Sequence, residues 1–97
     1  MPTFITLLRW TEQGVKNIKD SPSRIDQARE ALKAVGGEMK EFYLTLGPYD
    51  AVAICEAPTG KAYAQFALSV ASKGNVQTET LRSFTEEQYR DIIASLP

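Results

Sequence analysis

The chain has no histidine, and its 97 residues include a single cysteine and a single tryptophan. Without histidine it lacks the usual general base near neutral pH, the proximal haem ligand and the commonest metal ligand. Serine–histidine and cysteine–histidine nucleophiles are also excluded. Cys55 has no partner for an internal disulfide, and its small and apolar neighbours are typical of a buried, inert thiol. The sequence predicts neither a metal site nor a cofactor.

An excess of charge is also missing, because eleven Lys and Arg residues face twelve Asp and Glu residues and leave a formal net charge of −1. This balance provides no cationic field to attract phosphates or anionic lipid, so nucleic acid is not an expected partner. The longest uncharged stretch of the second half, residues 62–72, is too short to cross a membrane. Residues 1–4 lack the basic region and apolar run of a signal peptide. With the lone cysteine, these absences predict a cytoplasmic protein.

Four segments have the alternating or β-branched composition of strands, and they cover residues 3–10, 39–46, 51–57 and 76–84. In the second of them, alternation predicts Phe42 and Leu44 on one face, with Met39 and Tyr43 on the other. Residues 47–50 read Gly-Pro-Tyr-Asp, which predicts a tight turn because proline presets φ and glycine relieves the strand end. The second and third strands should therefore form a hairpin.

Two main helices are expected between the strands, one from Ser21-Pro22 to Gly36 and one from Pro58-Thr59 to Gly74. A short helical turn is expected after Thr11, although Gly14 weakens it. Thr85 and Gln88 match a capping box, which predicts a C-terminal helical extension over residues 84–97. This extension has an apolar stripe that must dock somewhere, formed by Tyr89, Ile92, Ile93 and Leu96.

The order β-α-β-β-α-β predicts an α+β, ferredoxin-like sandwich in one domain of residues 1–97, with the first and third strands in the sheet centre. Both main helices would cover the same face of the sheet. The other face would expose Phe or Met, Tyr and Ala side chains unless something packs on it. A homodimer is therefore expected, in which two facing sheets enclose a barrel-like space and the C-terminal helix covers an edge or reaches the partner.

Several separated blocks of the chain resemble the GYD-domain family of small bacterial and archaeal proteins. These blocks are Trp10-Thr11 with Gly14, Phe42 to Asp50, Glu56-Ala57-Pro58, and Gly74 to Arg82. The Gly-Tyr-Asp signature here reads Gly47-Pro48-Tyr49-Asp50, with a proline after the glycine. The resemblance runs over nearly the whole chain up to about Phe84. It implies a ferredoxin-like, dimeric α/β-barrel fold, and it brings no catalytic residues.

A candidate ligand site is formed by aromatic side chains with polar tips and by polar residues near the last strand. Its members are Trp10, Tyr43, Tyr49, Asp50, Glu79, Thr80 and Arg82. Arg82 could neutralise an anionic ligand that the hydroxyl and aromatic groups orient. Simpler interpretations stay open, because Asp50 could close the turn, Glu56 and Glu79 could face solvent or a salt-bridge partner, and the aromatics could pack a dimer interface.

The function that these features favour is a dimeric, small-molecule-binding module without an identifiable catalytic constellation. An alternative is an enzyme of the cofactor-independent oxygenase or isomerase class, with Tyr49, Asp50 or Glu79 in proton transfer. A third hypothesis is a pure oligomerisation module, whose sheet face serves only to join chains. The sequence leaves enzymatic activity open and favours its absence.

Overall fold

A four-stranded antiparallel sheet forms the centre of the computed structural model, which describes residues 1–97. Its strands are β1 (Thr3–Trp10), β2 (Glu38–Leu44), β3 (Ala51–Glu56) and β4 (Val76–Ser83). They lie in the order β2-β3-β1-β4, so β1 and β3 are central and β2 and β4 are the edges. This order confirms the ferredoxin-like topology expected from the sequence.

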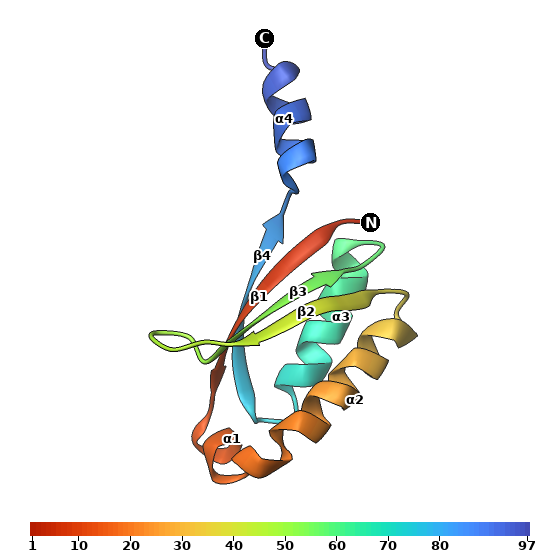
Figure 1. The fold of residues 1–97 in the computed structure, drawn as a ribbon. Coiled ribbons are helices and arrows are strands. Elements are labelled where there is room, and N and C mark those ends of the chain that lie inside the picture. The colour runs from red at the N-terminus through yellow and green to blue at the C-terminus, as the bar shows by residue number, and fades with distance from the viewer.

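Two helices, α2 (Ser21–Ala34) and α3 (Gly60–Ala71), lie side by side against one face of the sheet (Figure 1). Pro22 stands in the first turn of α2, where its missing N–H has no helical partner to lose. The Thr59 hydroxyl caps α3 by accepting a hydrogen bond of 3.0 Å from the amide of Ala62. None of the helices has the length and apolar character needed to cross a membrane.

The chain passes from β1 to α2 through α1 (Glu12–Lys16) and the 3-10 turn η1 (Ile18–Asp20). Gly14 is required here for close approach rather than for helix formation. A Cβ atom on Gly14 would lie 2.1 Å from the carbonyl oxygen of Asn75, just before β4. Glycine therefore lets α1 pack against the turn that joins α3 to β4, which explains a residue that otherwise weakens the helix.

The core is thin and lies between the sheet and the two covering helices. Only 11 of 97 residues are buried, as expected for a sheet covered on one face. The Phe4 and Tyr63 rings stack at its centre with their centroids 4.4 Å apart, and a hydrogen bond joins the hydroxyls of Tyr63 and Thr6. The core cluster consists of Phe4, Leu32, Ala53, Cys55, Ala57, Tyr63 and Phe66.

Alkaline pH should destabilise the fold through Tyr63. Burial raises the pKa of this phenol above its ordinary value of 10.0, so above that pH the unfolded chain releases the proton while the folded chain keeps it. The stabilisation that the protonated Tyr63 gives the folded state is fully present below about pH 10. Above that pH the free energy of unfolding falls by up to about 1.4 kcal/mol per pH unit for one proton. Urea unfolding from pH 8 to about pH 11 should show a shallower decline for Tyr63→Phe. Equal slopes in the two proteins would contradict this assignment.

The predicted alternation of β2 is wrong at one point. A bulge at Lys40 shifts the register, so that Met39 pairs with Cys55 while Glu41 pairs with Ile54. The extra residue places Met39 on the same side of the sheet as Phe42, and both pack against the core. The strand also ends at Leu44, because residues 45–50 form a loop in which Leu46 is 96% exposed.

The second face of the sheet has no helix on it, and we call it the open face. Its apolar residues are Ile5, Leu7, Tyr43, Val52, Ile54 and Leu81. The prediction of an uncovered face is confirmed, but its composition was partly wrong, because Phe4, Ala51 and Ala53 of the central strands, and Met39 and Phe42 of β2, lie on the helix side of the sheet. In their place, aliphatic residues alternate with Arg9, Glu41, Glu56 and Glu79.

The last helix, α4 (Glu86–Ala94), continues outward from the end of β4 and stands clear of the sheet and of the other helices (Figure 1). Thr85 and Gln88 form the expected capping box, and Arg90 pairs with Glu86 at 2.8 Å. Its stripe remains uncovered within the chain, since Tyr89, Ile92, Ile93 and Leu96 are 58%, 45%, 49% and 61% exposed.

Candidate functional site

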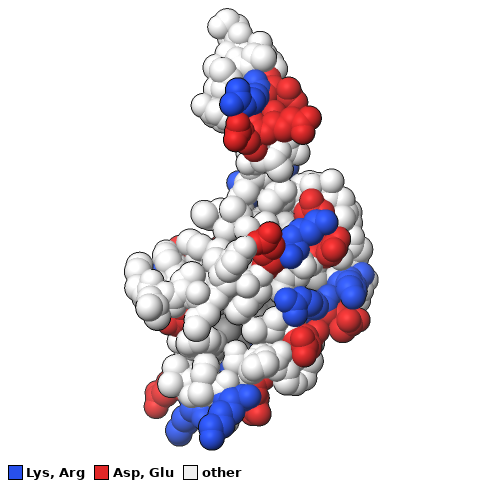
Figure 2. All heavy atoms as spheres, in the orientation of Figure 1, with Lys and Arg blue, Asp and Glu red and all other residues white.

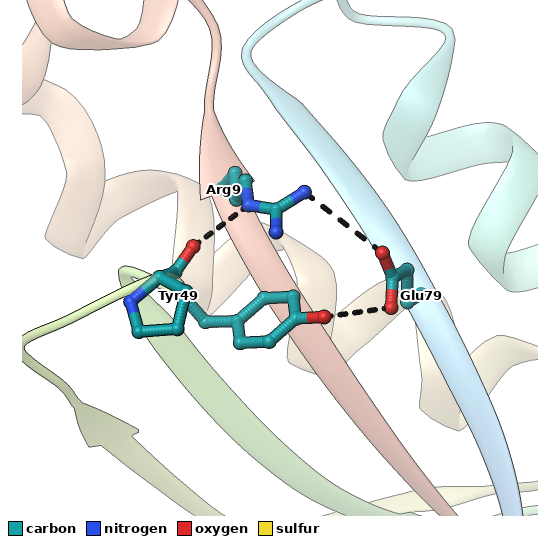
Figure 3. A network of polar contacts seen from close by, with 4 residues as sticks. Arg9, Tyr49 and Glu79 are labelled. Carbon is teal, nitrogen blue, oxygen red and sulfur yellow. Dashed lines mark hydrogen bonds and ion pairs between the residues drawn. The ribbon is translucent and has the colours of Figure 1, made fainter.

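A polar network on the open face joins the hairpin loop to β1 and β4 (Figure 3). Tyr49 donates a hydrogen bond of 2.9 Å to one Glu79 oxygen, and Arg9 approaches the other at 3.8 Å. Arg9 also lies 4.5 Å above the centre of the Tyr49 ring and donates to the Pro48 carbonyl at 2.7 Å. The network brings together Tyr49 and Glu79 of the predicted site and adds Arg9, which the sequence analysis did not select.

The network favours the protonated form of the Tyr49 phenol. The hydrogen bond to Glu79 raises the pKa of Tyr49, with burial and the negative charge of Glu79 adding to the effect and Arg9 opposing it. The Glu79 carboxylate already accepts from Tyr49 and faces Arg9. These contacts link the hairpin loop and β1 to β4, while the Glu79 side chain remains about half exposed.

Asp50 also serves the hairpin. Its carboxylate accepts a 2.9 Å hydrogen bond from the Trp10 amide, and its own amide donates to the Leu8 carbonyl at 2.8 Å. Its carbonyl accepts from the Thr45 amide at 2.9 Å, which closes the loop. Asp50 therefore fixes the loop to the end of β1, in agreement with the simpler of the two interpretations of this residue.

Three other predicted residues, Trp10, Thr80 and Arg82, lie on the opposite side of the sheet. Arg82 pairs with Phe4 of β1, and Thr80 pairs with Thr6. The Arg82 guanidinium lies 4.4 Å from the Phe84 ring centre and donates to the Ser83 carbonyl. The Thr80 hydroxyl is 3.4 Å from that of Thr6. The third residue, Trp10, lines a cleft beside the helices.

The seven predicted residues therefore do not meet in one pocket. Tyr43, which donates to Glu41 and is 52% exposed, lies on the open face like Tyr49 and Glu79. Asp50 lies at the end of the hairpin, and the remaining three belong to the helix side. A ligand role for each of them stays a prediction, but a single site that uses all seven does not fit this geometry.

A cleft of about 100 Å³ lies between the sheet, α2 and α3. Its walls are largely apolar, and Trp10 is the one predicted site residue among them. Two cationic residues, Arg24 and Lys73, also line it. Arg24 was not selected from the sequence, because the alternation of charges along α2 gives no signal that this residue borders the cleft.

Cys55 is fully buried beneath the helices, as expected. Burial raises the pKa of its thiol, and the opposing effects of Tyr63 and Arg29 are smaller. The thiolate needed for nucleophilic attack is therefore disfavoured. No group of three or more His, Cys, Asp and Glu side chains is arranged to hold a metal ion.

Solved structures of two other proteins share this fold. A crystal structure of TTHA0845 from Thermus thermophilus matches with a TM-score of 0.56 and 25% identity, covering 88% of this chain and 95% of that one. The crystal structure of FFRP-DM1 matches with a TM-score of 0.58 and 24% identity, covering 87% of this chain and 100% of that one. The second likeness concerns the fold alone.

Sequence comparison assigns the family. A relative from Thermus thermophilus is 36% identical in an alignment of 97 residues that covers 99% of each chain, and it is named a glutamine synthetase and cystathionine beta-lyase binding protein. The model of the GYD domain matches residues 4–93 of the present chain. That match extends beyond Phe84 through most of α4, and it confirms the resemblance seen in the sequence. The chain belongs to the GYD domain family.

Proposed function

We propose that the protein is a homodimeric protein-binding module that attaches to a metabolic enzyme through α4. The observation that carries this proposal is the exposed apolar stripe of α4, which no other part of the chain covers. The name of the 36% identical relative supports protein partners and gives two candidates, glutamine synthetase and cystathionine beta-lyase. The fold has two separate surfaces that nothing in the chain covers: the open face, for a second copy of the chain, and the apolar stripe of α4, for the enzyme.

The length of α4 indicates that it needs a partner. Helices below about 12 residues are marginal in water even when their sequence favours helix. α4 has 9 residues, and its cap and its exposed ion pair each add little. Tyr89, Ile92 and Ile93 of the helix, with Leu96 just beyond its end, recur at spacings of three and four, the pattern by which an amphipathic helix enters a groove of another protein. Glu86 and Glu87 stand in its first turn, and Figure 2 shows charged residues of both signs gathered near the base of the helix.

The open face is suited to a second copy of the chain. Its aliphatic centre is flanked by residues of both signs, Arg9 and Lys40 as well as Glu41 and Glu79. In a two-fold contact each residue meets the same surface on the partner, so a rim with both signs can complement itself. This arrangement supports the homodimer expected from the sequence and leaves α4 free for the enzyme.

Calorimetric titration of the purified protein into glutamine synthetase from the same organism, and separately into cystathionine beta-lyase, tests the proposal. We expect saturable binding to at least one enzyme. The double variant Ile92→Glu/Ile93→Glu should weaken it by about 100-fold or more, because two charges would enter an apolar groove. The same variant should remain a dimer by light scattering.

A matched control is Glu87→Gln/Asp91→Asn, which changes two residues on the polar side of the same helix. It should bind within about threefold of the native chain, since exposed charges contribute little. The proposal fails if neither enzyme binds. It also fails in its assignment of surfaces if Ile92→Glu/Ile93→Glu separates the dimer, because α4 would then belong to the contact between copies.

A further inference from the structure

We infer that the cleft between α2, α3 and the sheet is a binding site for a small carboxylate with an apolar body. This inference does not depend on the proposed protein-binding role, because the cleft lies on the opposite side of the sheet from the open face. A dimer formed through the open face would leave it accessible. The cleft would therefore give this chain a second function.

Small side chains on facing elements create the space. Ala51 and Ala53 project from β3, Ala28 and Ala31 from α2, and Ala67 from α3, and all five line the cleft. Larger aliphatic residues at these positions would fill it, as in a close-packed core. Its volume is about 100 Å³. A cavity of roughly 150 Å³ accepts benzene whole, so this smaller, open cleft admits part of a six-carbon body and leaves the rest, with the head group, outside.

The charge of the lining selects the head group. Arg24 and Lys73 are cationic, whereas no Asp or Glu lines the cleft. Neither cation forms an ion pair. Arg24 donates to the carbonyls of Asn17 at 2.9 Å and Gly14 at 3.4 Å, which hold the guanidinium in place without neutralising it. The held guanidinium of Arg24 and the exposed ammonium of Lys73 border apolar walls, and this combination favours an anion that carries an apolar body.

The single tryptophan of the chain lines this cleft, so its fluorescence reports occupancy directly. The probes are benzoate, phenylacetate and hexanoate, each compared with its neutral amide and with acetate, which has the head group but no apolar body. We expect the three acids to give saturable changes in Trp10 fluorescence and to bind about tenfold or more tightly than the amides. Acetate should give no saturable change.

Two pairs of variants place the site. Arg24→Gln/Lys73→Gln should abolish the preference for acid over amide, whereas Lys19→Gln/Lys33→Gln removes two positive charges outside the cleft and should preserve it. The single variant Arg24→Lys keeps the positive charge and should retain much of the preference for acid over amide. Ala28→Leu fills the cleft and should prevent binding, whereas Ala34→Leu, on α2 but outside the lining, should not. Circular dichroism checks that each variant is folded.

Three results would overturn the inference. The first is the absence of a saturable response to any of the three acids up to its solubility. The second is equal binding of acid and amide, or an equal loss in the Lys19→Gln/Lys33→Gln control. The third is a loss of dimer or of enzyme binding in Ala28→Leu with no response to the acids, since the cleft would then hold a protein segment.

Discussion

Leu81→Arg is expected to convert the homodimer into monomers, with an increase in the dimer dissociation constant of about 100-fold or more. Leu81 lies opposite Ile5 on the open face and is 49% exposed in the isolated chain. In the proposed dimer the new guanidinium would be removed from water, and the neighbouring carboxylate on the same face of β4, Glu79, already pairs with Arg9 and accepts from Tyr49. A poorly compensated buried charge is among the most damaging changes at an interface. Sedimentation velocity over a range of protein concentrations measures the effect.

Leu68→Arg is the matched control, because Leu68 is 71% exposed on α3 and takes no part in the core cluster. This variant should dimerise like the native chain. If Leu81→Arg also dimerises normally, the open face is not the contact between copies. A native protein that is monomeric at all concentrations would contradict the homodimer itself.

Leu32→Ala should have the largest effect on stability, lowering the free energy of unfolding by about 2–5 kcal/mol. Leu32 is fully buried, and it packs where α2 ends against the start of β2. A Cβ atom on Gly37 would lie 2.7 Å from the Leu32 side chain, so the neighbouring backbone already touches this residue. The cavity left by alanine therefore has little room to close. Urea unfolding at one fixed protein concentration gives the difference, because assembly also contributes to stability.

The control for this change is Leu68→Ala, at a position that is 71% exposed. It should alter the free energy of unfolding by no more than about 0.5 kcal/mol. A loss below about 1 kcal/mol for Leu32→Ala would mean that the core is not centred where the packing places it.

The strands, helices and sheet order could be predicted because the spacing of apolar residues agrees with the residues that begin and end each element along most of the chain. Ser21-Pro22, Thr59 and Thr85 begin helices by side-chain or proline effects that act within one turn. The bulge at Lys40 could not be predicted in this way. A bulge is defined by how two strands pair, and the alternation of residues within β2 gives no information about its pairing with β3.

The candidate site was harder to predict, because residue type does not give the face of the sheet. Trp10, Thr80 and Arg82 share one face, as the register of β1 with β4 shows. Glu79 lies on the other face, and Tyr49 reaches it from the hairpin loop. Arg9 joins the second group by alternation with Leu7 and Ile5, but its contact with Glu79 needs that same register. The signature residues Tyr49 and Asp50 each form a hydrogen bond that ties the hairpin loop to a neighbouring strand.

Hydrogen–deuterium exchange of α4, measured on the protein alone and with saturating glutamine synthetase or cystathionine beta-lyase, tests the central proposal most directly. We expect rapid exchange of residues 86–94 in the free dimer, because a short helix without packing opens readily, and strong protection in the complex. The open face should be protected in both samples. Slow exchange of α4 in the free protein, or rapid exchange in the presence of both enzymes, would contradict α4 as the enzyme-binding element.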